Sequence, residues 1–106
     1  MLFLGGHPRA PVRKIGNHLV RVGTWGCAEA YSVRGPHLRP MIEFWLDRAT
    51  KPNAMLDFIT GEYASLTNSY AIYPPVTQQL PGWSEIGQKH DDKRDLVRRG
   101  WANNLA

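Results

Sequence analysis

Proline and glycine interrupt this chain so often that no regular element can be long. The chain has eight prolines and ten glycines in 106 residues. Proline breaks a helix and cannot donate to a strand ladder, and glycine weakens both kinds of element. Because 42% of the residues are hydrophobic, too many for a wholly disordered chain, a small core is still feasible. We therefore expect a core of short elements that are joined by ordered irregular chain.

A chain of this length forms one domain, since domains cluster at roughly 100–150 residues. The patterns described below predict a small α+β domain with an N-terminal β-hairpin, two to three short helices and long Pro-rich extended segments. We divide the chain into three parts. These are an extended basic arm at 1–17, a small α+β core at 18–70, and an extended Pro-rich strap with a C-terminal polar helix at 71–106.

Residues 18–33 predict the β-hairpin. The β-rich stretches HLVRV and AEAYSV lie on either side of a GTWG turn. In the expected register Arg21 faces Glu29, and Leu19 faces Tyr31 on the same side of the ribbon. An opposite-charge pair and an aliphatic–aromatic pair then share one register, which favours this pairing.

Residues 41–49 predict the first helix. Pro40 stands where proline commonly opens a helix, and the helix is expected to end before Pro52. Its apolar residues cover an arc of about 200° around the helix axis, which is wide for a surface helix. We therefore expect this helix to be buried on two sides.

Residues 54–66 predict the second helix, with Asn53 as its N-cap. Gly61 lies away from its apolar side and is expected to weaken the helix by up to ~1 kcal/mol relative to alanine. Phe58 also lies off the apolar stripe. Five residues form the expected core stripe of this helix: Met55, Leu56, Ile59, Tyr63 and Leu66.

A third helix is expected at 91–99, with Gly100 as the residue that ends it. Its acidic residues precede its basic ones, which is the order that the helix dipole favours. Leu96 and Val97 are its only apolar residues and point about 100° apart. A helix of nine residues without an apolar stripe is marginal in water, so we expect other contacts to hold it.

The sequence offers little for catalysis. The four histidines are scattered without metal-site spacing, and Cys27 is the only cysteine. Cys27 becomes a nucleophile only if a histidine approaches it in space, and a small buried thiol is the favoured interpretation. Asp91 and Lys93 match half of a metal-dependent nuclease pattern, but acids at a helix N-terminus explain them equally well. We therefore expect no catalytic residue, no cofactor and no metal site.

The basic charge is concentrated at the start of the chain. Residues 1–40 hold six basic residues and one acidic residue, a net charge of +5, whereas residues 41–106 hold seven basic and eight acidic residues, a net charge of −1. Such a segment suits an anionic partner, which is nucleic acid, an acidic protein face or a membrane surface. The alternative is a solvated basic surface with no specific partner. Four residues are the expected contacts to the anionic partner: Arg9, Arg13, Lys14 and Arg21.

The segment AIYPPVTQQLPGW at 71–83 combines three prolines with several apolar side chains and no charge. We expect it to run extended, with its adjacent prolines holding it away from any sheet interior and with Tyr73 and Trp83 facing a neighbouring protein. Trp, Tyr and Arg dominate the energetics of protein interfaces. Eight residues are the expected protein contacts: Trp83, Tyr73, Ile72, Pro74, Pro75, Leu80, Trp101 and Phe58.

These features favour a non-catalytic structural or accessory subunit that binds other proteins within a large assembly, such as a virion or an organellar complex. The alternatives are a nucleic-acid-associated protein that uses the basic N-terminal arm, and a small protein inhibitor. No run approaches the roughly 20 apolar residues that span a bilayer, so no transmembrane segment is expected. A single cysteine excludes an internal disulfide and favours a reducing intracellular compartment, with a virion or a mitochondrion as further locations.

Overall fold

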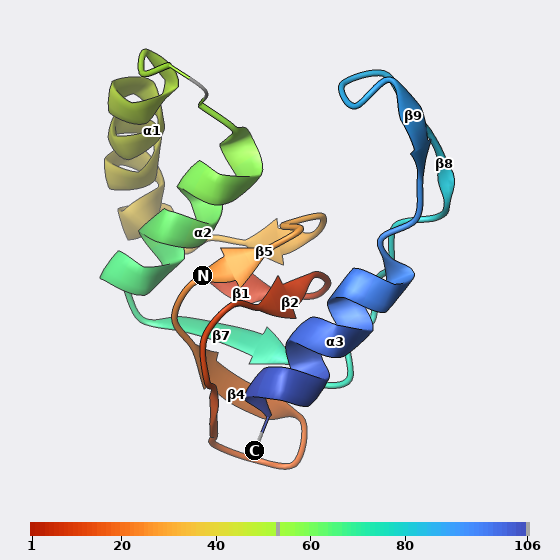
Figure 1. Cartoon of the computed structure of the whole chain (residues 1–106). Helices are drawn as coiled ribbons and strands as arrows, with labels where there is room; N and C mark the ends of the chain where they lie inside the picture. Colours follow the sequence, from red (N-terminus) through yellow and green to blue (C-terminus); the bar gives the residue numbers. More distant parts are fainter. Residues whose placement is uncertain (53, 106) are drawn as a thin grey trace.

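A five-stranded mixed sheet, in the order β3-β4-β7-β1-β6, forms the framework of the computed structural model, which describes residues 1–52 and 54–105 (Figure 1). The central strand β7 runs parallel to β1 and antiparallel to β4. The sheet strands are β1 (Leu2–Phe3), β3 (Arg13–Lys14), β4 (Leu19–Val22), β6 (Tyr31–Ser32) and β7 (Ser69–Ile72).

Two small ladders and three helices complete the fold, which confirms the α+β class. The strands β2 (His7–Pro8) and β5 (Trp25–Gly26) form one ladder. The hairpin of β8 (Gly82–Ser84) and β9 (Lys89–Asp91) forms the other and extends away from the body (Figure 1). The helices are α1 (Gly35–Ala49), α2 (Leu56–Leu66) and α3 (Arg94–Asn104). Within the described ranges, no helix has both the length and the apolar content for crossing a membrane.

Aromatic rings on one side of the sheet form the centre of the core. The Phe3 ring stacks on Trp25 at 4.7 Å, and Trp101 meets Trp25 edge-on at 5.6 Å. Both indole N–H groups are satisfied, because Trp25 Nε1 donates to the Gly5 carbonyl and Trp101 Nε1 donates to the Gly6 carbonyl, each at 3.0 Å. The core therefore joins the start, the middle and the end of the chain.

Residues 1–17 are part of this core, where the charge pattern had predicted an extended arm. They contribute β1, β2 and β3, and Phe3 has no exposed surface. The reason is local and apolar: Phe3 fits the ring cluster, and the Gly5–Gly6 backbone approaches the two indoles. The basic residues of this segment, Arg9, Arg13 and Lys14, are exposed, whereas strands β1 and β2 of the same segment contain buried residues.

The predicted hairpin at 18–33 is wrong. Strand β4 pairs with β3 and β7, and β6 pairs with β1. The partner β7 offers β4 a better buried side, since Val20 lies opposite the fully buried Ala71 and Val22 lies opposite Ser69. Strand β7, whose buried residues lie opposite the buried residues of β4, therefore takes the place of the predicted partner at 28–33.

The predicted ends and buried sides of α1 and α2 also need correction. Helix α1 begins at Gly35 and contains Pro40, and only Met41 is buried in it, so it is not buried on two sides. Helix α2 begins at Leu56, and the predicted cap Asn53 lies outside the described residues. Of the expected stripe, Ile59 and Tyr63 are buried, whereas three residues are at least half exposed: Met55, Leu56 and Leu66.

Helix α2 turns its small residues to the core because strand β5 passes against them. A side-chain carbon added at Gly61 would lie 2.0 Å from the Trp25 carbonyl oxygen. Thr60 and Ala64 are buried beside it. Gly61 is therefore a contact point between helix and strand, and the expectation that it lies on the outer side of the helix is wrong.

Helix α3 continues through Gly100, which the sequence had predicted as its end. The extra turn supplies the missing apolar stripe, because Val97 and Trp101 are one turn apart and both buried. The close approach of the helix to β2 explains the glycine: a side-chain carbon at Gly100 would lie 2.4 Å from His7 Nδ1. The Asn104 side chain then donates to the Pro8 carbonyl at 3.2 Å.

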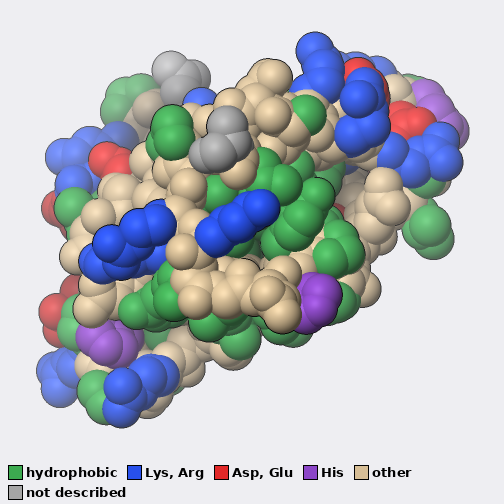
Figure 2. Space-filling view, turned by 90° about the horizontal axis from the view of Figure 1, so that it is seen from below, with side chains coloured by type: hydrophobic (Ala, Val, Ile, Leu, Met, Phe, Trp, Pro, Cys, Tyr) green, Lys and Arg blue, Asp and Glu red, His purple; other side chains and the backbone are tan. Residues whose placement is uncertain are grey.

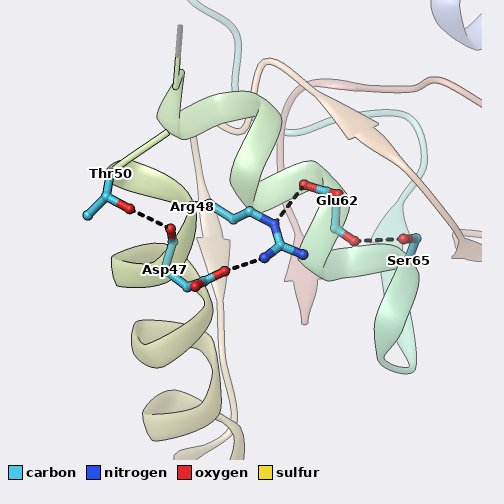
Figure 3. Close-up of polar contacts among 5 residues, drawn as sticks. All are labelled: Asp47, Arg48, Thr50, Glu62 and Ser65. Carbon is cyan, nitrogen blue, oxygen red and sulfur yellow. Dashed lines mark hydrogen bonds and ion pairs between the residues drawn. The ribbon is translucent and has the colours of Figure 1, made fainter. Parts of the chain in front are cut away.

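Arg48 joins the last turn of α1 to α2 (Figure 3). Its guanidinium pairs with Asp47, lies 3.9 Å from the Glu62 carboxylate, and stacks 4.5 Å from the Phe44 ring. Ser65 Oγ donates to the Glu62 carbonyl at 2.6 Å. Exposed ion pairs contribute at most about 1 kcal/mol each, so this cluster orients the two helices more than it stabilises them.

We expect Gly61→Ala to destabilise the protein by about 3 kcal/mol, because the added methyl group meets the β5 backbone and cannot be accommodated by a side-chain movement. Urea denaturation monitored by circular dichroism measures the change. The control is Gly16→Ala, where no atom lies within 4 Å of the added carbon, and its stability should stay within about 0.5 kcal/mol of the wild type. A Gly61→Ala protein as stable as the wild type would contradict the contact between α2 and β5.

Candidate binding surfaces

A groove of about 380 Å³ lies between the segment 73–78 and helix α3. Of the described residues in its lining, Arg94 and Arg98 carry a charge. Tyr73 forms part of one wall and packs on Trp101, with ring centres 4.8 Å apart. The remaining lining is largely apolar: Pro74, Pro75, Thr77, Gln78, Val97, Ala102 and Leu105. A concave apolar site with a few polar groups at its edge is the usual form of a binding site.

Local sequence fixes both walls of the groove. Two prolines end strand β7, since proline cannot continue a central strand. The backbone N–H groups of Val76 and Thr77 then donate to the Leu4 carbonyl, at 2.8 and 3.2 Å, which holds the segment beside β1. On the other wall, the spacing of four residues in α3 places Val97, Trp101 and Leu105 on one side of the helix.

The two groove arginines are held by carboxylates of their own segment. Arg94 forms a bidentate pair with Asp92, at 3.0 Å from Nε and 2.7 Å from Nη2. These hydrogen bonds lower the pKa of Asp92 to about 2. Arg98 pairs with Asp95 at 2.6 Å and lowers the pKa of that carboxyl group. The guanidinium groups are thereby oriented along the groove edge while their side chains remain largely exposed.

Four of the eight predicted protein contacts line this groove: Tyr73, Pro74, Pro75 and Trp101. Trp101 is buried beneath the groove, so it supports the lining but has little exposed surface for a partner to contact. The other four lie elsewhere. Ile72 ends strand β7, and Phe58 on α2 is half exposed beneath the Arg9 guanidinium at 5.0 Å.

The strap prediction is partly wrong. Residues 71–72 belong to the central strand β7, and Ala71 has no exposed surface, so the prolines do not keep the segment away from the sheet. The other two predicted contacts are exposed: Trp83 is 58% exposed on β8, opposite His90 of β9, and Leu80 is 84% exposed just before the hairpin.

One apolar surface was not among the predicted contacts. Leu38, Ile42 and Leu46 follow one another at a spacing of four residues on α1, and all three are exposed. Ile42 and Leu46 belong to the wide apolar arc that predicted burial of this helix on two sides, whereas Leu38 lies before the predicted start of the helix. The structure leaves this side of α1 uncovered.

The four predicted anionic contacts separate into three environments. Arg13 and Arg21 lie directly opposite each other on β3 and β4. Lys14, the next residue, belongs to the adjacent cross-strand row, and Arg9 lies over Phe58. Seen from below, on the side of β4, basic and hydrophobic side chains share the middle of the surface, and acidic side chains gather toward its edges (Figure 2).

Cys27 lines a separate cleft of about 260 Å³ together with His7, Asp57 and Lys93. Burial raises the pKa of the thiol, and the Lys93 ammonium acts in the opposite direction. His7 is buried, its Nδ1 lies 3.2 Å from the Pro8 carbonyl, and burial lowers its pKa. Among the described residues no hydrogen bond joins His7 to the thiol, so the geometry leaves Cys27 in its unreactive protonated form at neutral pH.

Within residues 1–52 and 54–105, no group of three or more His, Cys, Asp or Glu side chains is arranged to hold a metal ion. The half-pattern at Asp91 and Lys93 is an ion pair of 3.1 Å. Comparison of the chain with protein-family models, with curated proteins and with solved structures gave no match. The surfaces themselves are therefore the basis for a functional proposal.

We expect Cys27 to react slowly with iodoacetamide at neutral pH, and faster only above the ordinary pKa of a thiol, because burial disfavours the thiolate. Mass spectrometry of the alkylated protein at a series of pH values gives the rate. Lys93→Gln should move the rate profile to higher pH, since it removes the cation that lowers the thiol pKa. Lys51→Gln is the control and should leave the profile unchanged. Rapid alkylation below pH 7 would show that Cys27 is an activated nucleophile.

Proposed function

We propose that this protein is a non-catalytic structural or accessory subunit that binds neighbouring proteins within a larger assembly. The groove between the segment 73–78 and α3 is its main contact surface in this proposal. The observation that carries the proposal is the lining of the groove, which combines a tyrosine, two adjacent prolines and an apolar helix face. Extended peptide segments dock in aromatic-lined apolar grooves. The fixed φ of the two prolines makes this wall of the groove rigid, so little conformational entropy of the wall is lost on binding.

The chemistry of the groove specifies its occupant. The charged side chains among the described lining residues are Arg94 and Arg98, and both are cationic. Their bonds to Asp92 and Asp95 fix their orientation, but the guanidinium groups retain further N–H donors. The proposed occupant is therefore an extended apolar segment of a neighbouring protein that carries a carboxylate beside the apolar residues.

Other exposed apolar surfaces favour an assembly with more than one neighbour. The α1 stripe of Leu38, Ile42 and Leu46 lies on a helix far from the groove (Figure 1). At the β8–β9 hairpin, Ile86 is 94% exposed and Trp83 is 58% exposed. Contiguous apolar surface on a small protein marks contact sites. A reducing compartment, proposed from the single cysteine, is compatible with this role.

The test is selection from a displayed library of random peptides on the folded protein. We expect enrichment of apolar peptides that contain Asp or Glu. Ala102→Glu should weaken their binding by roughly 30-fold, equivalent to about 2 kcal/mol, because Ala102 is an exposed residue of the groove lining. Asn103→Glu, the next residue of α3, is exposed and outside the lining, so it should retain binding.

Charge reversal gives a second readout. Arg98→Glu should select peptides with Lys or Arg in place of the acidic residue. Equal thermal unfolding of the variants and the wild type establishes that their folds are intact. The proposal fails if no peptide is enriched, or if the enriched peptides bind the Ala102→Glu variant as tightly as the wild type.

A further inference from the structure

The strand register aligns one residue from every strand of the five-stranded sheet in a single row. Arg13 lies opposite Arg21, Arg21 opposite Tyr70, Tyr70 opposite Leu2, and Leu2 opposite Ser32. Directly opposed residues point to the same side of a sheet. With strands about 4.8 Å apart, the row spans ~19 Å. We call this set the open row: Ser32, Leu2, Tyr70, Arg21 and Arg13.

The open row faces away from the core. The next row along the strands contains the fully buried Phe3 and Ala71 together with Val20, so that side of the sheet carries the core. Helix α2 packs on β5 and helix α3 packs on β2, both of which belong to the core side. In the open row, by contrast, Arg13, Arg21 and Ser32 are exposed, and Leu2 and Tyr70 are half-buried. Helix α1 borders the open row at its N-terminal end, where His37 lines a cavity with Leu2 and Tyr70.

The cations of the open row have no anionic partner within the described part of the chain. Every basic residue that forms an ion pair there lies at position 39 or later. Arg21 instead donates to the Asn68 side-chain oxygen at 2.7 Å, and Arg13 faces Arg21 directly. Opposed like charges destabilise a strand pair. An anionic ligand would remove this repulsion.

Tyr70 adds a ring surface beside these cations. It lines a cavity of about 290 Å³ at the same side of the sheet, next to the N-terminus of α1. Arg34 supplies a further cation to the lining, and Ser32 and Asn68 supply hydrogen-bonding side chains. A ring for stacking, polar groups for base edges and cations for phosphates are the features with which open sheets bind single strands.

We propose that the open row binds single-stranded nucleic acid, with Tyr70 stacking on a base and Arg13 and Arg21 contacting phosphates. A single strand is favoured over a duplex because its bases are free to stack, and because the sheet presents a shallow surface with no helix that enters a groove. The inference goes beyond the proposed protein-binding function and uses a different surface. It also replaces the expectation of a basic arm with a site on a folded sheet.

The test measures fluorescence anisotropy of a labelled single-stranded 12-mer of dT, and of the same length of duplex, over a series of salt concentrations. We expect log K to fall linearly with log[salt], with a slope of about −1.4 to −2.1 for two or three phosphate contacts. Arg13→Gln and Arg21→Gln should each weaken binding and reduce the slope by about 0.7. Lys14→Gln, a neighbour of Arg13 on the same strand but in the adjacent row, should leave the slope nearly unchanged.

Tyr70 gives a readout that is independent of charge. Tyr70→Ala should weaken binding roughly 5- to 150-fold at each salt concentration while the slope stays the same, and Tyr70→Phe should retain binding, because stacking needs only the ring. Ala102→Glu in the groove should not change binding to the 12-mer, which distinguishes this site from the proposed protein-binding site. Urea denaturation of each variant verifies that it is folded.

Several outcomes would overturn the inference. One is an absence of binding to the 12-mer at low salt, and another is tighter binding to the duplex than to the single strand. Equal losses for Lys14→Gln and Arg21→Gln would indicate general attraction of a basic surface. Binding to vesicles that contain phosphatidylserine, with no binding to the 12-mer, would assign the surface to a membrane.

Discussion

Two buried indole N–H groups hold the molecule together, because they fasten the middle and the end of the chain to one dipeptide near its start. Trp25 and Trp101 donate to the consecutive carbonyls of Gly5 and Gly6. Position 6 has no room for a side chain. Gly6 has a φ of 86°, and a side-chain carbon there would lie 2.3 Å from the Cys27 carbonyl oxygen. Left-handed backbone and close approach both require glycine. The Trp101 bond therefore helps to hold α3, which forms one wall of the groove, against the start of the chain.

The sequence predicts those parts of the fold that depend on neighbouring residues. The α+β class and the core of α2 follow from local composition and from the spacing of Ile59 and Tyr63. Strand pairing does not, since β4 pairs with β3 and with β7, which lies about 50 residues away, and not with the predicted partner at 28–33. The same limit explains Gly61 and Gly100. Local rules interpret them as a weak point and a helix end, whereas both are places where a helix approaches another backbone or ring.

For the candidate surfaces, as for the fold, the sequence predicts which segments are involved but not which residues share a face. The sequence indicates that the basic excess lies before position 40, and that the apolar side chains of the segment 71–83 suit a contact with protein. It does not indicate which basic residues share a face, because that depends on register. A shift of one residue in a strand moves every side chain to the other side. Arg13 and Lys14 are neighbours in sequence, yet only Arg13 is aligned with Arg21 and Tyr70.

Strand β7 connects the two proposed surfaces. Tyr70 belongs to the open row, and Tyr73, three residues later, packs against Trp101 in the groove. Between them Ala71 is fully buried and pairs with Val20, so the strand cannot shift without opening the core. Packed cores resist gradual deformation. Both surfaces are therefore held at a fixed separation on one rigid element, and a protein segment in the groove leaves the open row free for a second ligand. Taken together, the two proposals describe a subunit that joins a nucleic acid strand to a neighbouring protein without any conformational change of its own.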